Sequence, residues 1–127
     1  MTMKLPTTKE YLRVRSTLIK KVFPSLRRQN SICARGNFAN TQTSAIFALS
    51  EQCKRRGKSC GLVFWTTQEN DRFREGGRVI LYISHSDDSP SSQQIIDVGR
   101  AVVAECKENG LTVDWNGKAN QAIEVSL

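Results

Sequence analysis

Apolar side chains recur every three or four residues near the start of the chain. Such spacing gathers them on one face of an α-helix. The stripe consists of Tyr11, Val14, Leu18, Val22 and Leu26, and it is widened by Leu12, Ile19 and Phe23. Thr7 and Glu10 have the spacing of a capping box, whereas Pro24 disfavours helical geometry at the residue before it. The pattern predicts a first helix from Thr7 to about Phe23, followed by a connection over residues 24–40.

Two longer helices are predicted further along the chain. The first covers residues 41–56 and is followed by Gly57, which suits the C′ position of a helix. The second begins with a capping box formed by Ser91 and Gln94 and ends before Gly110. Each has apolar residues at helical spacing, so each is expected to bury one face.

Four segments have the composition of β-strands. They are residues 60–66, 78–84, 111–115 and 122–125. The first is a continuous apolar run, which is typical of a strand covered on both faces, and the last two are joined by an Asn-Gly turn that predicts a hairpin. Two helical turns are expected over residues 68–75. The elements predict an α+β fold in the order α-α-β-(α)-β-α-β-β, with a single four-stranded sheet and the helices packed on one face.

Length and charge indicate how the chain is organised. Its 127 residues correspond to a single domain, since domains commonly contain about 100–150 residues. Within residues 1–127, we expect a frayed end at 1–6, a basic helical segment at 7–36 and a near-neutral α+β body at 37–127. The formal net charge is +7, yet residues 1–36 contain nine basic side chains and one acidic one. This asymmetry indicates an electrostatic partner for the N-terminal segment.

The basic N-terminal segment supplies the candidate partner-binding residues. They are Lys9, Arg13, Arg15, Lys20, Lys21, Arg27 and Arg28. We expect a non-enzymatic protein-interaction module of immunity, inhibitor or regulatory type, whose protein partner has an acidic surface. The alternative is a nucleic-acid-binding protein in which the same side chains contact phosphates. A second basic cluster follows the helix over residues 41–56, where cations complement the helix dipole, and this structural explanation suffices for it. It consists of Lys54, Arg55, Arg56 and Lys58.

The cysteines and the apolar pattern bear on the compartment and on cofactors. Cys33, Cys53, Cys60 and Cys106 form no C-x-x-C pair, and neither a signal peptide nor an apolar run of membrane length is recognisable. We therefore expect reduced thiols in a cytoplasmic protein without membrane association. One histidine and scattered cysteines do not easily assemble a zinc site, and nucleotide-binding glycine patterns are missing from the sequence. No metal or cofactor is expected, and the oligomeric state is left open.

Polar side chains near the predicted strand ends are candidates for a small pocket. They are Asn37, Gln42, Thr67, Gln68, Glu69, His85 and Trp115. Strand ends and the helices that start there can offer free backbone N–H groups to a ligand, but capping, solvation and packing are the favoured explanations for these residues. An enzyme acting through His85, Glu69 or Cys33 is the remaining alternative, because histidine is the residue type that titrates near neutral pH. No catalytic residue is assigned.

Several short motifs resemble those of an uncharacterised family of small bacterial domains. The chain has Asn-Phe at residues 37–38, Gln-Glu at 68–69, Gly-Gly at 76–77 and Trp-Asn-Gly at 115–117. Over residues 31–126 the resemblance implies a bacterial cytosolic domain of unknown function and supports the predicted fold. Asn40, Thr41 and Ser44 stand where the family has a cysteine cluster. The resemblance therefore implies no thiol or metal role for this chain.

Overall fold

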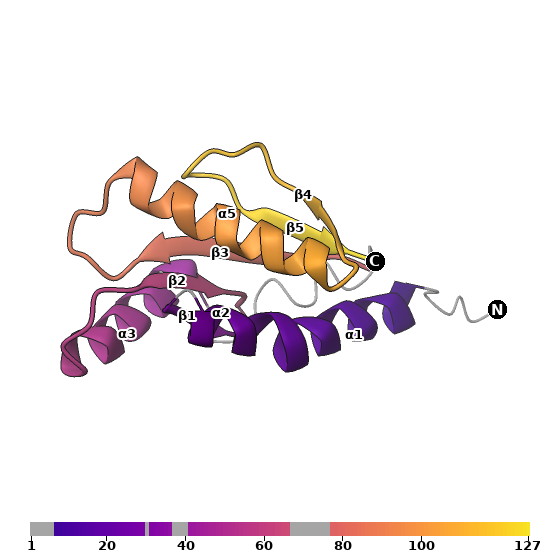
Figure 1. Ribbon diagram of the computed structural model, residues 1–127, viewed down its shortest axis with the longest axis horizontal. Coiled ribbons are helices and arrows are strands. Elements are labelled where there is room, and N and C mark those ends of the chain that lie inside the picture. The colour runs from indigo at the N-terminus through magenta and orange to yellow at the C-terminus, as the bar shows by residue number, and fades with distance from the viewer. Residues whose placement is uncertain (1–6, 30, 37–40, 67–76) are drawn as a thin grey trace.

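The computed structural model describes residues 7–29, 31–36, 41–66 and 77–127. Its helices and strands in chain order are α1 (Thr7–Thr17), η1 (Leu18–Val22), α2 (Phe23–Gln29), β1 (Ile32–Arg35), α3 (Gln42–Arg55), β2 (Gly61–Phe64), β3 (Val79–His85), α5 (Ser92–Glu108), β4 (Thr112–Asp114) and β5 (Ile123–Ser126). Figure 1 shows α5 running along β3 and β5, and α1 and α2 following one another in a single rod.

The strands of the described residues form one five-stranded sheet in the order β1-β2-β3-β5-β4. β1 and β2 are parallel, whereas each of the other neighbouring pairs is antiparallel. The predicted α+β class is therefore confirmed. The predicted C-terminal hairpin is also confirmed, because β4 and β5 pair antiparallel, and the connection at residues 115–122 contains Gly117 with a φ of 82°.

The prediction of four strands is wrong, because the segment expected to be a connection contains β1. Ile32 and Ala34 of this strand are buried, and Arg35 is exposed. Four residues contain too few repeats for a period of two to be recognised in the sequence. The strand forms because its backbone pairs with β2, in a register that sets Cys33 beside Leu62.

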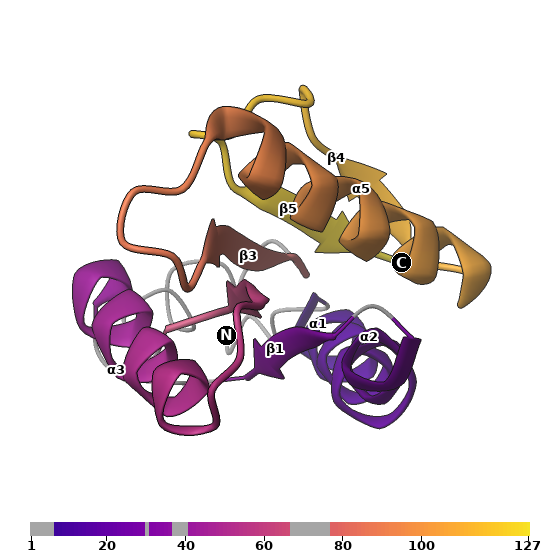
Figure 2. The same ribbon diagram turned by 60° about the vertical axis from the view of Figure 1, so that its left-hand side comes forward.

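Helices cover both faces of the sheet, so the prediction that they share one face is also wrong. Buried Ala45 and Leu49 of α3 pack against Leu62 and Phe64 of β2. The opposite face belongs to α1, α2 and α5, whose apolar cluster includes Val63. Figure 2 shows α3 and α2 on opposite sides of β1. The cause is the uninterrupted apolar run in β2, because its side chains point alternately to the two faces and each face needs cover.

The prediction that the N-terminal helix ends near Phe23 is wrong. The helix continues beyond this residue as α2. Residues Leu18–Val22 form a π-helical turn, after which Phe23 N–H donates to the carbonyl five residues back. The wider turn accommodates Pro24, which has no N–H to donate and whose ring would crowd a carbonyl in an ordinary α-helix. The predicted apolar stripe of this helix is buried, apart from Leu12 and Ile19, which are exposed.

Both of the longer helices begin with a side-chain cap. Thr41 Oγ1 accepts the N–H of Ser44 at the start of α3. Ser91 and Gln94 form a complete capping box at the start of α5. Gly57 follows α3 with a φ of 66°, the left-handed conformation that favours glycine after a helix.

Some sequence expectations concern parts of the chain outside the described residues. They are the frayed end at residues 1–6, the helix over residues 68–75 and the side chain of the capping residue Thr7. The helices that are described include none with both the length and the apolar character needed to cross a bilayer.

The substitution Gly61→Ala is expected to destabilise the fold. Gly61 is buried in β2, and a Cβ atom there would collide with Cγ2 of Val98 on α5. Because relieving the collision would separate α5 from the sheet, we expect the free energy of unfolding to fall by about 1–3 kcal/mol in urea denaturation. Gly61→Ala/Val98→Ala removes the collision, so the double variant is expected to lose less than the sum of the two single losses. Additive losses would contradict the close packing.

Candidate binding groove at the sheet edge

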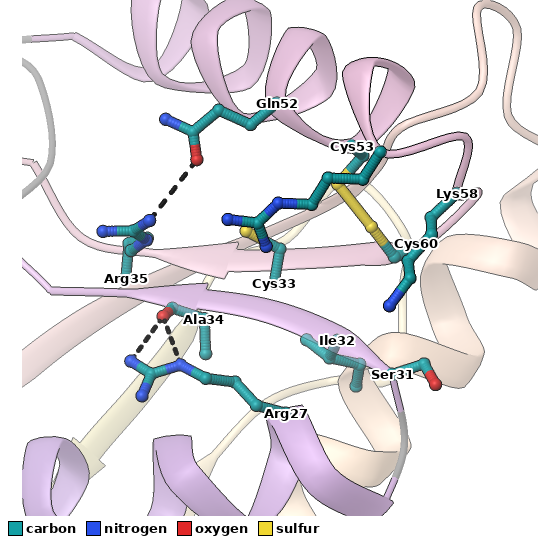
Figure 3. Close-up of a pocket in the computed structure, with 11 residues that line it drawn as sticks. Arg27, Ser31, Ile32, Cys33, Ala34, Arg35, Gln52, Cys53, Lys58 and Cys60 are labelled. Atoms are coloured by element: carbon teal, nitrogen blue, oxygen red, sulfur yellow. Dashed lines mark hydrogen bonds between the residues drawn. A yellow bond between two sulfur atoms is a disulfide. The ribbon is translucent and has the colours of Figure 1, made fainter.

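A groove of about 460 Å³ follows the outer side of β1. We call it the edge groove. Its lining consists of residues 31–35 on the strand, Arg27 on α2, and Gln52, Cys53, Arg56, Lys58 and Cys60 at the end of α3 and in the loop that follows. β1 stands at the end of the strand order, so within the described residues no strand pairs with its outer side. Figure 3 shows the strand edge-on, with α3 above it and Arg27 of α2 below it.

Four cationic side chains converge on the edge groove. Arg27, Arg35, Arg56 and Lys58 line it, and no Asp or Glu is among its lining residues. None of the four takes part in an ion pair within the part of the chain that the structure describes. Concentrated charge of one sign beside a low-dielectric protein wall strengthens the local potential. The groove is therefore suited to anionic groups.

Arg27 provides hydrogen-bond donors to a backbone carbonyl on the outer edge of β1. Its Nε and Nη2 atoms donate hydrogen bonds to the carbonyl oxygen of Ala34, over 3.3 and 2.9 Å. On the α3 side, Arg35 Nη2 donates to Gln52 Oε1 over 3.4 Å. Both guanidinium groups thus bond to uncharged acceptors and retain their charge for a ligand (Figure 3).

A disulfide between Cys53 and Cys60 closes the loop that contains Arg56 and Lys58. The Cα atoms of the pair are 6.7 Å apart, and the bond joins the end of α3 to the start of β2. The expectation that all four cysteines are reduced thiols is therefore wrong for these two. Sequence spacing did not indicate the pair, because the return of the chain after Gly57 is what brings the two side chains together.

The same loop is anchored to the connection between β3 and α5. Ser59 Oγ donates to Asp87 Oδ1 over 2.7 Å, and Cys60 N–H donates to Ser86 Oγ over 2.9 Å. The Ser59 hydroxyl, followed by the side-chain amide of Gln94, holds the pKa of the Asp87 carboxyl below its ordinary value. Asp88 forms an ion pair with Lys54 next to the loop. These contacts and the disulfide anchor the backbone of the loop that carries two of the four groove cations.

The basic residues predicted to bind a partner divide into three groups. Arg27 lines the edge groove, and the guanidinium of Arg15 lies 5.8 Å from the ring centroid of Trp65. The remaining five are exposed along the helix and do not line the groove: Lys9, Arg13, Lys20, Lys21 and Arg28. Lys21 instead borders a shallow depression together with Glu105 and Glu108 of α5.

The predicted small pocket is not assembled by the residues that can be placed. Gln42 is the exposed first residue of α3. His85 ends β3, where its Nδ1 accepts the N–H of Asp87 over 3.2 Å, in a depression lined by neither Gln42 nor Trp115. Trp115 Nε1 donates to the carbonyl oxygens of Lys118 and Gln121, so this side chain organises the turn between β4 and β5. Asn37, Thr67, Gln68 and Glu69 lie outside the described residues.

Sequence reasoning did not assign Arg35, Arg56 and Lys58 to a site. Arg35 stood in a segment without a recognisable period, and Arg56 and Lys58 were explained by the dipole of the preceding helix. The usable signal was the cluster of four basic residues around the end of α3, Lys54, Arg55, Arg56 and Lys58. The convergence of Arg56 and Lys58 with Arg27 depends on β1 lying between α2 and α3.

The fold and the groove together define an α+β domain with a mixed sheet and a basic groove along one sheet edge. A family model described as "Domain of unknown function (DUF6891)" matches residues 14–127, and the chain belongs to this family. The resemblance to an uncharacterised domain family is thereby confirmed. Neither a curated protein nor a solved structure matches the chain. Among the described residues, no three His, Cys, Asp or Glu side chains gather as potential metal ligands.

Removing the disulfide by Cys53→Ser/Cys60→Ser is expected to lower the free energy of unfolding by about 2–3 kcal/mol, because the unfolded chain gains the freedom of the opened loop. Denaturation in urea with and without a reductant measures the effect. The reductant is expected to destabilise the wild type and to leave the double variant unchanged. Cys33→Ser, which keeps the disulfide, is the control and should retain the reductant effect. Equal sensitivity of wild type and double variant to the reductant would contradict the assignment.

The two free cysteines are expected to differ in reactivity. Cys33 is half-buried at the groove, whereas Cys106 is fully buried, and burial raises the pKa of its thiol to about 12. Because the thiolate is the nucleophile, iodoacetamide at about pH 8 is expected to label Cys33 in the folded protein and Cys106 only after unfolding. Mass spectrometry of the digested protein locates the label. Labelling of Cys106 at the rate of Cys33 under native conditions would contradict the burial.

Proposed function

We propose that this chain is a non-enzymatic protein-interaction module of immunity, inhibitor or regulatory type, which binds an acidic surface of its partner through the edge groove. The observation that supports the proposal is the convergence of Arg27, Arg35, Arg56 and Lys58 on a groove without a lining carboxylate. A module of this type acts by binding and covering a surface of its partner. Its function therefore requires a surface complementary to the partner and no catalytic residues.

The charge state of the groove is suited to the carboxylates of an acidic partner. Among the described residues, Arg56 and Lys58 have no ion-pair partner, and the two other cations bond to a backbone carbonyl and a side-chain amide. Exchanging an uncharged acceptor for a carboxylate strengthens a guanidinium hydrogen bond and allows two parallel bonds. Opposite charges also accelerate encounter with an acidic partner and disfavour basic ones.

The nucleic-acid alternative uses the cations predicted along the N-terminal helix, of which only Arg27 also lines the edge groove. In that alternative the exposed residues along the N-terminal helix, such as Arg13, Lys20 and Lys21, contact phosphates. The two functions are therefore distinguished by which cations the binding requires. Both sets are exposed, so both can be altered without disturbing the core.

Two charge-reversal variants test the proposal. The groove variant is Arg35→Glu/Arg56→Glu/Lys58→Glu, and the helix variant is Arg13→Glu/Lys20→Glu/Lys21→Glu, which changes the net charge by the same amount. Binding of labelled poly-L-glutamate and of a random DNA duplex is measured by fluorescence anisotropy at low salt, where ionic contacts are least screened. Circular dichroism verifies that each variant is folded.

The groove variant is expected to bind poly-L-glutamate at least about tenfold more weakly than the wild type, a loss of about 1.4 kcal/mol. The helix variant, which removes equal charge elsewhere, is expected to lose less than about threefold. Equal losses in the two variants would contradict a specific role for the groove. Tighter binding of DNA than of poly-L-glutamate, abolished only in the helix variant, would establish the nucleic-acid alternative instead.

A further inference from the structure

We propose that the partner's acidic segment binds in extended form as an additional strand of the sheet, pairing through its backbone with the outer edge of β1. This inference rests on the proposed function and specifies how the partner is held. It would place the incoming segment in the edge groove, between α2 on one face of the sheet and α3 on the other (Figure 3).

The outer edge of β1 offers backbone groups in a row. The Ala34 carbonyl accepts two hydrogen bonds from Arg27. Ser86 N–H donates to the Cys60 carbonyl, so in the register of the sheet the polar groups of Gly61 and Val63 face β1. They meet those of Cys33 and Arg35, which leaves the Ala34 carbonyl pointing away from the sheet. The N–H and C=O groups of one residue in a strand point to the same side, and those of the next residue point to the opposite side. The polar groups of Ile32 therefore also face outward, whereas those of Cys33 and Arg35 face β2. An extended segment lying beside β1 can therefore form backbone hydrogen bonds with these outward-facing groups, as a neighbouring strand does.

Arg27 occupies the position that the incoming backbone would take. Its two hydrogen bonds to the Ala34 carbonyl satisfy an acceptor that another strand would satisfy with an N–H. When that N–H replaces it, the guanidinium is released next to the incoming segment and can pair with a carboxylate. The acceptor is satisfied before and after the exchange, so an unpaired buried group never arises.

The side chains of the groove define the spacing of the acidic residues. Cys33 and Arg35 point to the face covered by α3, because the alternate residues Ile32 and Ala34 belong to the core on the other face. Arg35, together with the cations of the loop after α3, therefore lies along one face of an added strand. Acidic side chains at every second position of the segment reach this face, since side chains of a strand alternate.

Charge disfavours a second copy of this chain as the occupant. The formal net charge of +7 and the four groove cations repel another copy, in the way that basic side chains protect exposed sheet edges from self-association. The same cations attract an acidic segment of another protein. We therefore infer that the partner segment has acidic residues alternating with residues of high strand propensity.

Three peptides of identical charge test the inference. The first is a blocked, labelled heptapeptide of alternating Glu and Thr, the second is the same peptide N-methylated on its Glu amides, and the third is N-methylated on its Thr amides. Only one of the two sets of amides can face β1, because the amides of a strand alternate in direction. Affinity is measured by fluorescence anisotropy for wild type, the groove variant and the helix variant.

The unmodified peptide is expected to bind the wild type and to lose at least about tenfold in affinity with the groove variant. One methylated peptide is expected to lose at least about tenfold, and the other less than about threefold. Amide exchange by NMR gives a direct readout, since the outward-facing N–H groups of Ile32 and Ala34 are expected to exchange more slowly when the unmodified peptide is bound.

Equal affinities of the two methylated peptides, or unchanged exchange at Ile32 and Ala34, would overturn strand addition. If the peptides nevertheless bound and required the groove cations, the proposed function would stand and only the mode of binding would be wrong. If the unmodified peptide did not bind, or bound equally well to the groove variant, both the inference and the proposed function would be wrong.

Discussion

The burial of β2 on both of its faces is the constraint on which the rest of the structure depends. Residues 61–64 are all buried, so α3 must cover one face and α1, α2 and α5 the other. α5 lies close to β2, because Gly61 has no side chain and Val98 of α5 occupies the space that one would need. β1 can pair with β2 because the two helical layers flank it, and the same layers leave its outer side open as a groove.

The loop after α3 shows how a local segment acquires a role through distant contacts. Its ends are joined by the Cys53–Cys60 disulfide, and Ser59 bonds to Asp87 in the connection that precedes α5. A loop rich in basic residues would by itself sample many conformations, and ordering it upon binding would cost conformational entropy. Anchoring the loop beforehand reduces the backbone part of that cost, which supports a role in recognition.

Much of the fold was predictable because several signals are local. Gly57 after α3, the capping box of Ser91 with Gln94, and the Asn-Gly pair between β4 and β5 each depend on a few neighbouring residues. The predictions that were wrong concern segments whose structure depends on contacts with residues distant in the sequence. β1 is too short to show a period, and the helix continues through Pro24 because a π-helical turn provides room. Of the seven basic residues predicted to bind a partner, all of which the structure describes, only Arg27 lines the groove, since its other cations come from separate segments.

The sequence by itself determined the α+β class, the longer helices, the C-terminal hairpin and an excess of basic residues in the first quarter of the chain. These properties follow from periodicity, capping and composition, which are local or additive. Tertiary structure alone decided that α3 lies opposite the other helices, that β1 forms the sheet edge, and that Arg27 and Arg35 meet Arg56 and Lys58 there. Such convergence depends on how the two faces of β2 are shared between helices, and that choice is made by packing over the whole chain.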